Sequence, residues 1–231
     1  MRRFLYPGRW FLLSAVAILV VGLLWYFAFG FNRPLKDVDP QELFQKALTS
    51  TKEVKSYSYR IKTQLTTAKG VRCLSDVHGV RILPDRVSVK GKIFNAPVEI
   101  IHIEGVTYVK DRFSNRWLTL EGERLGETGV FITELDPLVL LDFEEEPLVA
   151  YGKKERGRSE ELYSLQFKPR VRNRFLTAQF TDFEYRVWIE PKTYHIVELQ
   201  VKTNNKAAPT KLTIDLSLRD FDRAPKIEPP L

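Results

Sequence analysis

The sequence of 231 residues predicts an α+β protein, with an N-terminal transmembrane helix followed by an antiparallel sheet packed on a few helices. Three observations lead to this prediction. Residues 10–31 form one uncharged apolar run, a capped amphipathic pattern follows, and short alternating segments continue to residue 219. Hydrophobic residues make up 44% of the chain and charged residues 28%, proportions that exclude wholesale disorder.

The apolar run from Trp10 to Phe31 is long enough to cross a membrane. As a helix it measures about 33 Å, against a hydrocarbon core of about 30 Å. It exceeds the apolar region of a signal peptide, and no A-x-A-like cleavage site follows it, so we expect an uncleaved signal anchor. Residues 1–9 carry three arginines and no acid, which predicts a cytoplasmic N-terminus.

The predicted organisation is therefore that of a single-pass cell-membrane protein with an extracytoplasmic domain. The expected parts are a cytoplasmic tail (1–9), the transmembrane signal-anchor helix (10–31), a linker (32–38), the domain itself (39–222) and a disordered tail (223–231).

The domain opens with a strong helix start. Asp39 is a good N-cap, Pro40 suits the first helical position, and Glu42 completes a capping box. Apolar residues then recur at helical spacing, so one amphipathic helix is expected to about Glu53.

The period then changes from 3.6 to 2. In Ser56–Leu65, apolar and aromatic residues alternate with polar ones, as in a strand with one buried face. Turn residues separate similar segments, which predicts an antiparallel meander. The further strands are expected at about 72–82, 86–90, 98–104, 107–110, 116–120, 148–156, 162–168, 184–190, 194–202 and 211–219.

The middle of the chain breaks this pattern. Residues 136–143 favour a short helix that is apolar on most of its circumference, either buried or forming a flap over an apolar cavity. Residues 171–181 are ambiguous and are expected to form a loop with one helical turn.

Catalytic signatures are missing from the sequence. It has no Walker loop, nucleophile elbow, HExxH motif or Gly-rich dinucleotide loop, so we expect no enzyme and no cofactor. The three histidines lack metal-ligand spacing, so no metal site is predicted. The lone Cys73 is expected to be a small buried hydrophobe.

The charge of the domain is mildly basic. The chain carries +7, of which the tail contributes +3, leaving +4 for the exported part and giving no indication of nucleic-acid binding. Basic residues on both sides of the strand at 162–168 are candidates for contact with an anionic surface. The alternative is a solvated hairpin paired with Glu155, Glu160 and Glu161. The candidates are Lys153, Lys154, Arg156, Arg158, Arg170, Arg172 and Arg174, with Lys168 between the two groups.

The order of these segments resembles a known group of bacterial proteins. A strand ending Trp188-Ile-Glu turns at Pro191-Lys-Thr into the next strand, and an earlier stretch reads Ile103-Glu-Gly-Val-Thr-Tyr-Val-Lys followed by Trp117-Leu. Both are similar to motifs of the LolA/LppX/LprG superfamily of lipoprotein carriers and lipid-binding lipoproteins. Some members of that superfamily carry a lipobox cysteine, whereas this sequence has the predicted transmembrane anchor instead. The resemblance implies a half-open antiparallel β-barrel packed on a few helices, with an apolar cavity for acyl chains.

The resemblance also implies the function: non-catalytic binding of a lipid or lipidated molecule. The alternative is a protein-binding envelope sensor or scaffold, as in RseB-like uses of the fold. A packed domain with an exposed apolar patch would favour that alternative. The residues expected to line a lipid cavity, or else to fill a core, are Tyr59, Ile61, Leu65, Val87, Val89, Tyr108, Trp117, Leu138, Leu141, Val187, Ile189, Leu199, Leu212 and Ile214.

Overall fold

The computed structural model describes residues 38–121, 132–152 and 162–230. The chain divides into two units, Met1–Asp39 and Pro40–Leu231, and the architecture below is that of the second unit. The transmembrane helix, the cytoplasmic tail and most of the linker predicted from the sequence lie outside the described residues.

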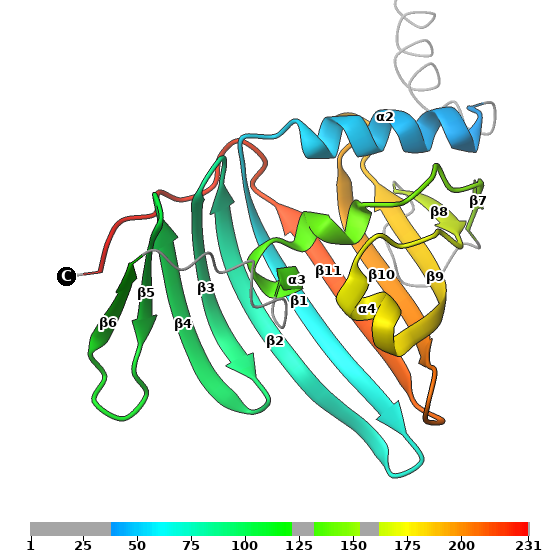
Figure 1. Cartoon of the computed structure of the whole chain (residues 1–231). Helices are drawn as coiled ribbons and strands as arrows, with labels where there is room; N and C mark the ends of the chain where they lie inside the picture. Colours follow the sequence, from blue (N-terminus) through cyan, green and yellow to red (C-terminus); the bar gives the residue numbers. More distant parts are fainter. Residues whose placement is uncertain (1–37, 122–131, 153–161, 231) are drawn as a thin grey trace, which may run out of the picture. The chain divides into compact units, whose positions relative to one another are not determined.

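One antiparallel sheet of eleven strands dominates the domain (Figure 1). The chain starts at the centre of the sheet, runs outward to one edge, crosses to the other edge and returns to the centre. There β1 (Ser56–Thr67) pairs with β11 (Lys211–Arg219). The strand order is β6-β5-β4-β3-β2-β1-β11-β10-β9-β8-β7, so β6 and β7 are opposite edges and the described sheet is open.

The predicted strands are confirmed with modest shifts of their ends. The strand predicted over 148–156 is described only for residues 149–151. The remaining bounds are β2 Gly70–Ile82, β3 Arg86–Ile93, β4 Ala96–Ile103, β5 Val106–Lys110, β6 Trp117–Glu121, β7 Val149–Tyr151, β8 Tyr163–Phe167, β9 Phe180–Ile189 and β10 Ile196–Asn205.

The predicted amphipathic helix is α2 (Pro40–Lys52). It buries Leu43, Phe44 and Ala47 against the sheet. The buried Thr51 hydroxyl donates to the Ala47 carbonyl at 2.7 Å and accepts from the Ile196 amide at 2.9 Å. That bond fixes the end of α2 over the start of β10.

The helix predicted over 136–143 is instead a 3-10 helix, η1 (Pro137–Leu141), preceded by a single α-helical turn, α3 (Ile132–Leu135). Proline disfavours the α conformation in the residue before it, and Asp136 is accordingly extended, with φ −137° and ψ 84°. The break at Pro137 divides the segment into two short pieces.

The ambiguous stretch 171–181 holds a helix, α4 (Arg174–Gln179), and the start of β9. Asn173 is the N-cap of α4, and its side-chain oxygen accepts from the amides of Phe175 and Leu176 at 3.1 and 3.2 Å. This capping signal was overlooked in the sequence.

Two further expectations differ from the structure. The tail beyond residue 222 was expected to be disordered, but it is described to residue 230 and its Ile227 is 5% exposed, because this apolar side chain packs against the domain. Cys73 was expected to be buried and is exposed. Strand β3 ends at Ile93, opposite Ser75, so Cys73 lies on the part of β2 that extends beyond it.

Candidate functional site

Most of the predicted cavity residues lie on one side of the sheet, which we call the helix-covered face because α2, α3 and η1 pack against it (Figure 1). Ten of the fourteen are fully buried there, while Leu65 and Leu138 are half-buried. The ten are Tyr59, Ile61, Val87, Val89, Leu141, Val187, Ile189, Leu199, Leu212 and Ile214.

Tyr108 and Trp117 belong to the opposite side, the outer face. Tyr108 is in register with Ile101 and Ser88, and Trp117 with Lys110. The helix-covered face carries their neighbours Val109 and Leu118 instead. Successive side chains on a strand point to opposite faces of the sheet, so an assignment shifted by one residue places every side chain on the wrong face. The placement of these two residues in the predicted cavity was therefore wrong.

The helix-covered face is filled over β8–β11, β1 and β2. Leu140 and Leu141 of η1 and Phe44 of α2 are each 0% exposed. Phe143 packs edge-on against Phe167 at 5.7 Å between ring centroids, and Phe167 stacks on Tyr185 at 5.4 Å. These side chains occupy the space that a ligand would need, so this half is a packed core.

Over β4–β6, the described apolar side chains on the same face are partly exposed. In register along one row, Tyr59 and Val89 are buried, Ile100 and Val109 are half-buried, and Leu118 is 53% exposed. Leu120, in the next row, is 40% exposed. We call the residues Val98, Ile100, Val109, Leu118 and Leu120 the open apolar patch.

The open apolar patch was not predicted from the sequence. The alternation of Leu118 and Leu120 with Trp117 and Thr119 was visible in the sequence, but the aromatic side chain was chosen as the inward one. Strand pairing decides which of the two sets faces inward.

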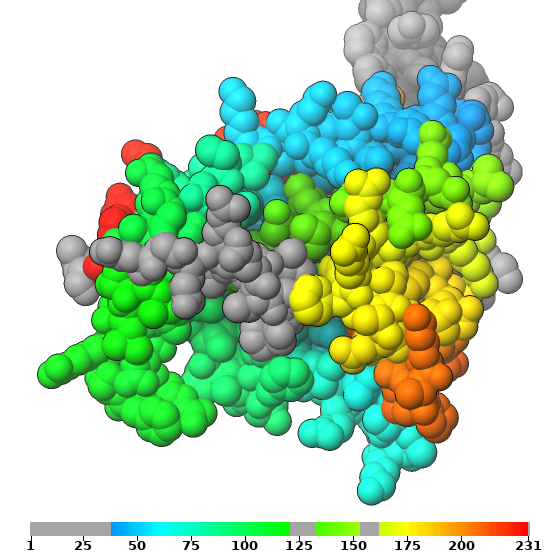
Figure 2. Space-filling model, in the orientation of Figure 1, coloured from blue at the N-terminus to red at the C-terminus, as the bar shows by residue number. Residues whose placement is uncertain are grey.

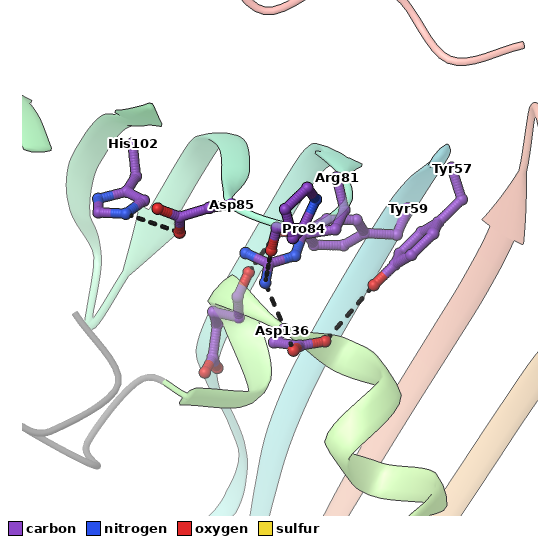
Figure 3. A network of polar contacts seen from close by, with 8 residues as sticks. Tyr57, Tyr59, Arg81, Pro84, Asp85, His102 and Asp136 are labelled. Carbon is purple, nitrogen blue, oxygen red and sulfur yellow. Dashed lines mark hydrogen bonds and ion pairs between the residues drawn. The ribbon is translucent and has the colours of Figure 1, made fainter. Parts of the chain in front are cut away.

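A polar cluster lies where the filled and open halves meet (Figure 3). The Tyr59 hydroxyl donates to the Glu134 carbonyl at 2.6 Å, and the Ser75 hydroxyl donates to the Glu134 carboxylate at 2.7 Å. The Tyr59 ring lies over Gly79, its cross-strand neighbour, where any added Cβ would collide with it. These bonds hold α3 against β1 and β2.

Asp136 joins the same cluster just before η1. Its carboxylate lies 3.8 Å from the Arg81 guanidinium and accepts from the Tyr57 hydroxyl at 3.5 Å. Burial, and to a lesser extent the Asp136 charge, raises the pKa of Tyr57 far above its ordinary value, so the phenol stays protonated. Burial likewise raises the pKa of Tyr59.

His102 is a structural residue rather than a free base. One ring nitrogen lies 2.9 Å from the Thr107 hydroxyl and the other 3.0 Å from the Asp85 carboxylate. The two ring nitrogens thus contact β5 and the β2–β3 turn, and the side chain is almost fully buried. In the described part of the chain, no group of three or more His, Cys, Asp or Glu side chains is arranged to hold a metal ion.

The basic candidates divide into two groups. Lys153, Lys154, Arg156 and Arg158 lie outside the described residues. Of the others, Arg170 pairs with Glu145 at 3.3 Å, Arg172 with Asp142 at 3.9 Å, and Lys168 with Glu184 at 2.8 Å. Arg174 is exposed at the start of α4.

Two hollows in the described residues lie on the outer face and not under the helices. The larger, about 740 Å³, has Gln166, Arg186 and Gln200 among its lining residues, together with the paired Arg170 and Lys168. The smaller, about 450 Å³, is lined by Arg60, Asp76 and His78 among others. Their walls mix both signs of charge, which does not suit an acyl chain.

No helix within residues 38–121, 132–152 and 162–230 is long and apolar enough to cross a membrane. The run at 10–31, on which the anchor prediction rests, lies outside these ranges.

Comparison with known proteins bears on the fold. No protein-family model matches the sequence, and no curated protein shows significant similarity to it. Among solved structures, LprF from Mycobacterium bovis is similar at 14% identity with a TM-score of 0.51, covering 83% of this chain and 96% of that one. The match to LprF over nearly its whole length identifies the fold of this chain. The described domain has the same fold as LprF.

Two other structures are similar at lower scores. Lipoprotein LppX from Mycobacterium tuberculosis has 13% identity and a TM-score of 0.49, covering 83% of this chain and 100% of that one. A LolA-superfamily protein from Nitrosomonas europaea has 11% identity and a TM-score of 0.35, covering 80% and 95%. The fold shared with LprF and the open antiparallel sheet agree with the expected half-open antiparallel architecture with few helices.

Proposed function

We propose that this protein binds a lipid or lipidated molecule without catalysis, with an acyl chain lying on the open apolar patch. One observation carries the proposal: a single sheet face is sealed by helices at one end and left apolar and partly exposed at the other. Apolar surface that continues a core and is left open is typical of binding sites.

The direction of the patch suits a chain-like ligand. The row from Val89 through Ile100 and Val109 to Leu118 runs across the strands, from the buried centre towards the edge. At about 4.8 Å per strand it spans about 14 Å. Each methylene group removed from water there contributes about 0.8 kcal/mol.

A protein partner is the second candidate, and a specific observation favours it. The core under the helices is packed, and among the described strands β6 pairs with β5 alone, so its outer edge is a place where a partner strand could add. An apolar peptide would then lie along β6 and cover Leu118 and Leu120.

Native mass spectrometry of the full-length chain in mild detergent separates these candidates. We expect a co-purifying lipid that is lost when Leu118 becomes Asp. The matched control is Thr119→Asp, because Thr119 is exposed on the outer face of the same strand and should retain the lipid. A lipid-free mass with no uptake of added phospholipid would refute the lipid proposal, and a co-purifying peptide would replace it.

We also propose that residues 10–31 anchor the chain in the cell membrane, with the N-terminus in the cytoplasm and the domain outside. The charge-free run and the three arginines before it support this topology. The partners would then be the bilayer itself and a lipid or an envelope protein.

Cys73 offers a direct test of this topology, because it is the one cysteine of the sequence and its side chain is exposed. A membrane-impermeant maleimide should label it in intact spheroplasts. The control chain carries Arg3→Cys together with Cys73→Ser and should react only after lysis. Labelling of Arg3→Cys in intact spheroplasts would reverse the topology.

A further inference from the structure

The end of the domain opposite α2 has a distinctive surface. Three hairpin turns, β1–β2, β3–β4 and β5–β6, lie at this end, together with the β10–β11 turn, because Thr66 pairs with Lys211 (Figure 1). Their tips protrude in cyan, green and orange at the lower edge of Figure 2. We call these four turns the hairpin rim, defined by residues 67–72, 92–97, 111–116 and 205–211.

Large apolar side chains project from the rim. Phe113 is 82% exposed, Phe94 63% and Val71 61%. Each sits at or next to the tip of a different hairpin, so none shields another within its own turn. Exposed aromatic side chains at turn tips cost solubility and add nothing to the core, which points to a role in contact.

Basic side chains surround these apolar tips. The rim carries Lys and Arg at seven positions and a single acid, Asp111. The Asp111 carboxylate accepts from the Ser114 hydroxyl and amide, which lowers its pKa and commits it to the turn. The seven are Lys69, Arg72, Lys92, Arg112, Arg116, Lys206 and Lys211.

These basic side chains lie outside the ion pairs formed among the described residues. Two basic groups of the larger outer-face hollow, Lys168 and Arg170, do form such pairs, with Glu184 and Glu145. The Arg112 guanidinium lies over the Phe113 ring at 4.4 Å, so charge and apolar surface are presented together.

We infer that the hairpin rim docks on the surface of an anionic phospholipid bilayer. Aromatic tips enter the boundary between head groups and acyl chains, and the lysines and arginines around them face the lipid phosphates. This contact is separate from the open apolar patch, which lies on the sheet face, and it does not depend on a ligand being bound there.

The test uses the full-length chain in phosphatidylcholine nanodiscs, mixed with separate vesicles of either phosphatidylcholine or equal parts phosphatidylcholine and phosphatidylglycerol. We expect flotation with the anionic vesicles and little with the neutral ones. Added salt should weaken the binding, because surface charges are screened within about 10 Å at 0.1 M.

Two rim variants should lose this binding. The triple variant Lys69→Gln, Arg112→Gln and Arg116→Gln should weaken partitioning roughly 100-fold, at about 1 kcal/mol per basic side chain near the membrane surface. The variant Phe94→Ser with Phe113→Ser should weaken it while leaving the salt dependence in place. All five positions are exposed, and thermal unfolding should confirm that the domain stays folded.

The matched control removes the same charge at the other end of the domain, through Lys46→Gln, Lys52→Gln and Lys55→Gln on and beside α2. This control should bind like the unaltered chain, and it shares residues 10–31 with the rim variants. Equal loss in the control and rim triples, or equal binding to neutral vesicles, would overturn the inference. Rim-dependent capture of heparin without vesicle binding would replace the bilayer with a soluble polyanion.

Discussion

The two halves of the helix-covered face both carry apolar side chains but differ in their exposure. Val187 of β9 and Leu199 of β10 are at most 1% exposed, while Leu118 of β6 is 53% exposed. The difference comes from what lies above them, because α2 and η1 cover the first set. The sequence of a strand thus does not show whether its apolar face is covered.

Truncating one leucine in each half is the strongest test of this comparison. Leu141→Ala should destabilise the domain by about 3 kcal/mol, since it leaves a cavity in a packed core. Leu118→Ala should change the free energy of unfolding by less than about 0.5 kcal/mol, since the side chain is largely solvated already. Urea unfolding measures both. Similar losses for the two variants would mean that both halves are sealed.

A smaller effect is expected at the boundary between the halves. Asp136→Ala should cost about 2 kcal/mol, because it leaves the Arg81 guanidinium, 15% exposed, without its counter-ion. The control is Asp76→Ala, which breaks a shorter pair, 2.9 Å from Arg60, whose side chain is 60% exposed. That loss should stay below about 1 kcal/mol. A larger loss for Asp76→Ala would contradict the view that burial, rather than distance, sets these energies.

The smallest expected effect is a pH dependence in the filled half. Burial lowers the pKa of His195 below its ordinary 6.5, and its ring packs 4.2 Å from that of Phe221. The unfolded chain then binds the proton more readily, so stability falls as pH drops from 6.5 through the folded-state pKa.

Thermal unfolding from about pH 8 to about pH 5 should show this fall, and His195→Gln should remove it. The exposed His78→Gln is the control and should leave the slope unchanged. The carboxylates of Asp76 and Glu184, whose pKa values are lowered by Arg60 and Lys168, act in a separate window, below their ordinary values of 3.8 and 4.5. A slope retained in His195→Gln would assign the effect to another group.

Much of the fold could be predicted from the sequence, because its signals are local. The capping residues before α2 and the alternation in β1 and β11 each report a backbone preference within about ten residues. The turn at Pro191–Thr193 is equally local: the Thr193 hydroxyl donates to the Glu190 carboxylate at 2.6 Å, and the hairpin of β9 and β10 follows.

The residues of the candidate site were harder to predict from the sequence than the fold, for a physical reason. Whether Trp117 or Leu118 faces inward depends on pairing with β5, and whether Leu141 fills a core or lines a cavity depends on helices distant in sequence. The hairpin rim likewise could not be predicted from the sequence, since its turns are separated by up to about 140 residues.

The strands, the capped helix α2 and their order therefore follow from the sequence, which also contains the apolar run that predicts an anchor. The exposure of Phe113 and the contact of the Arg112 guanidinium with its ring are set by the tertiary structure. Burial and charge neutralisation depend on neighbours in space, and strand pairing and helix packing bring those neighbours together.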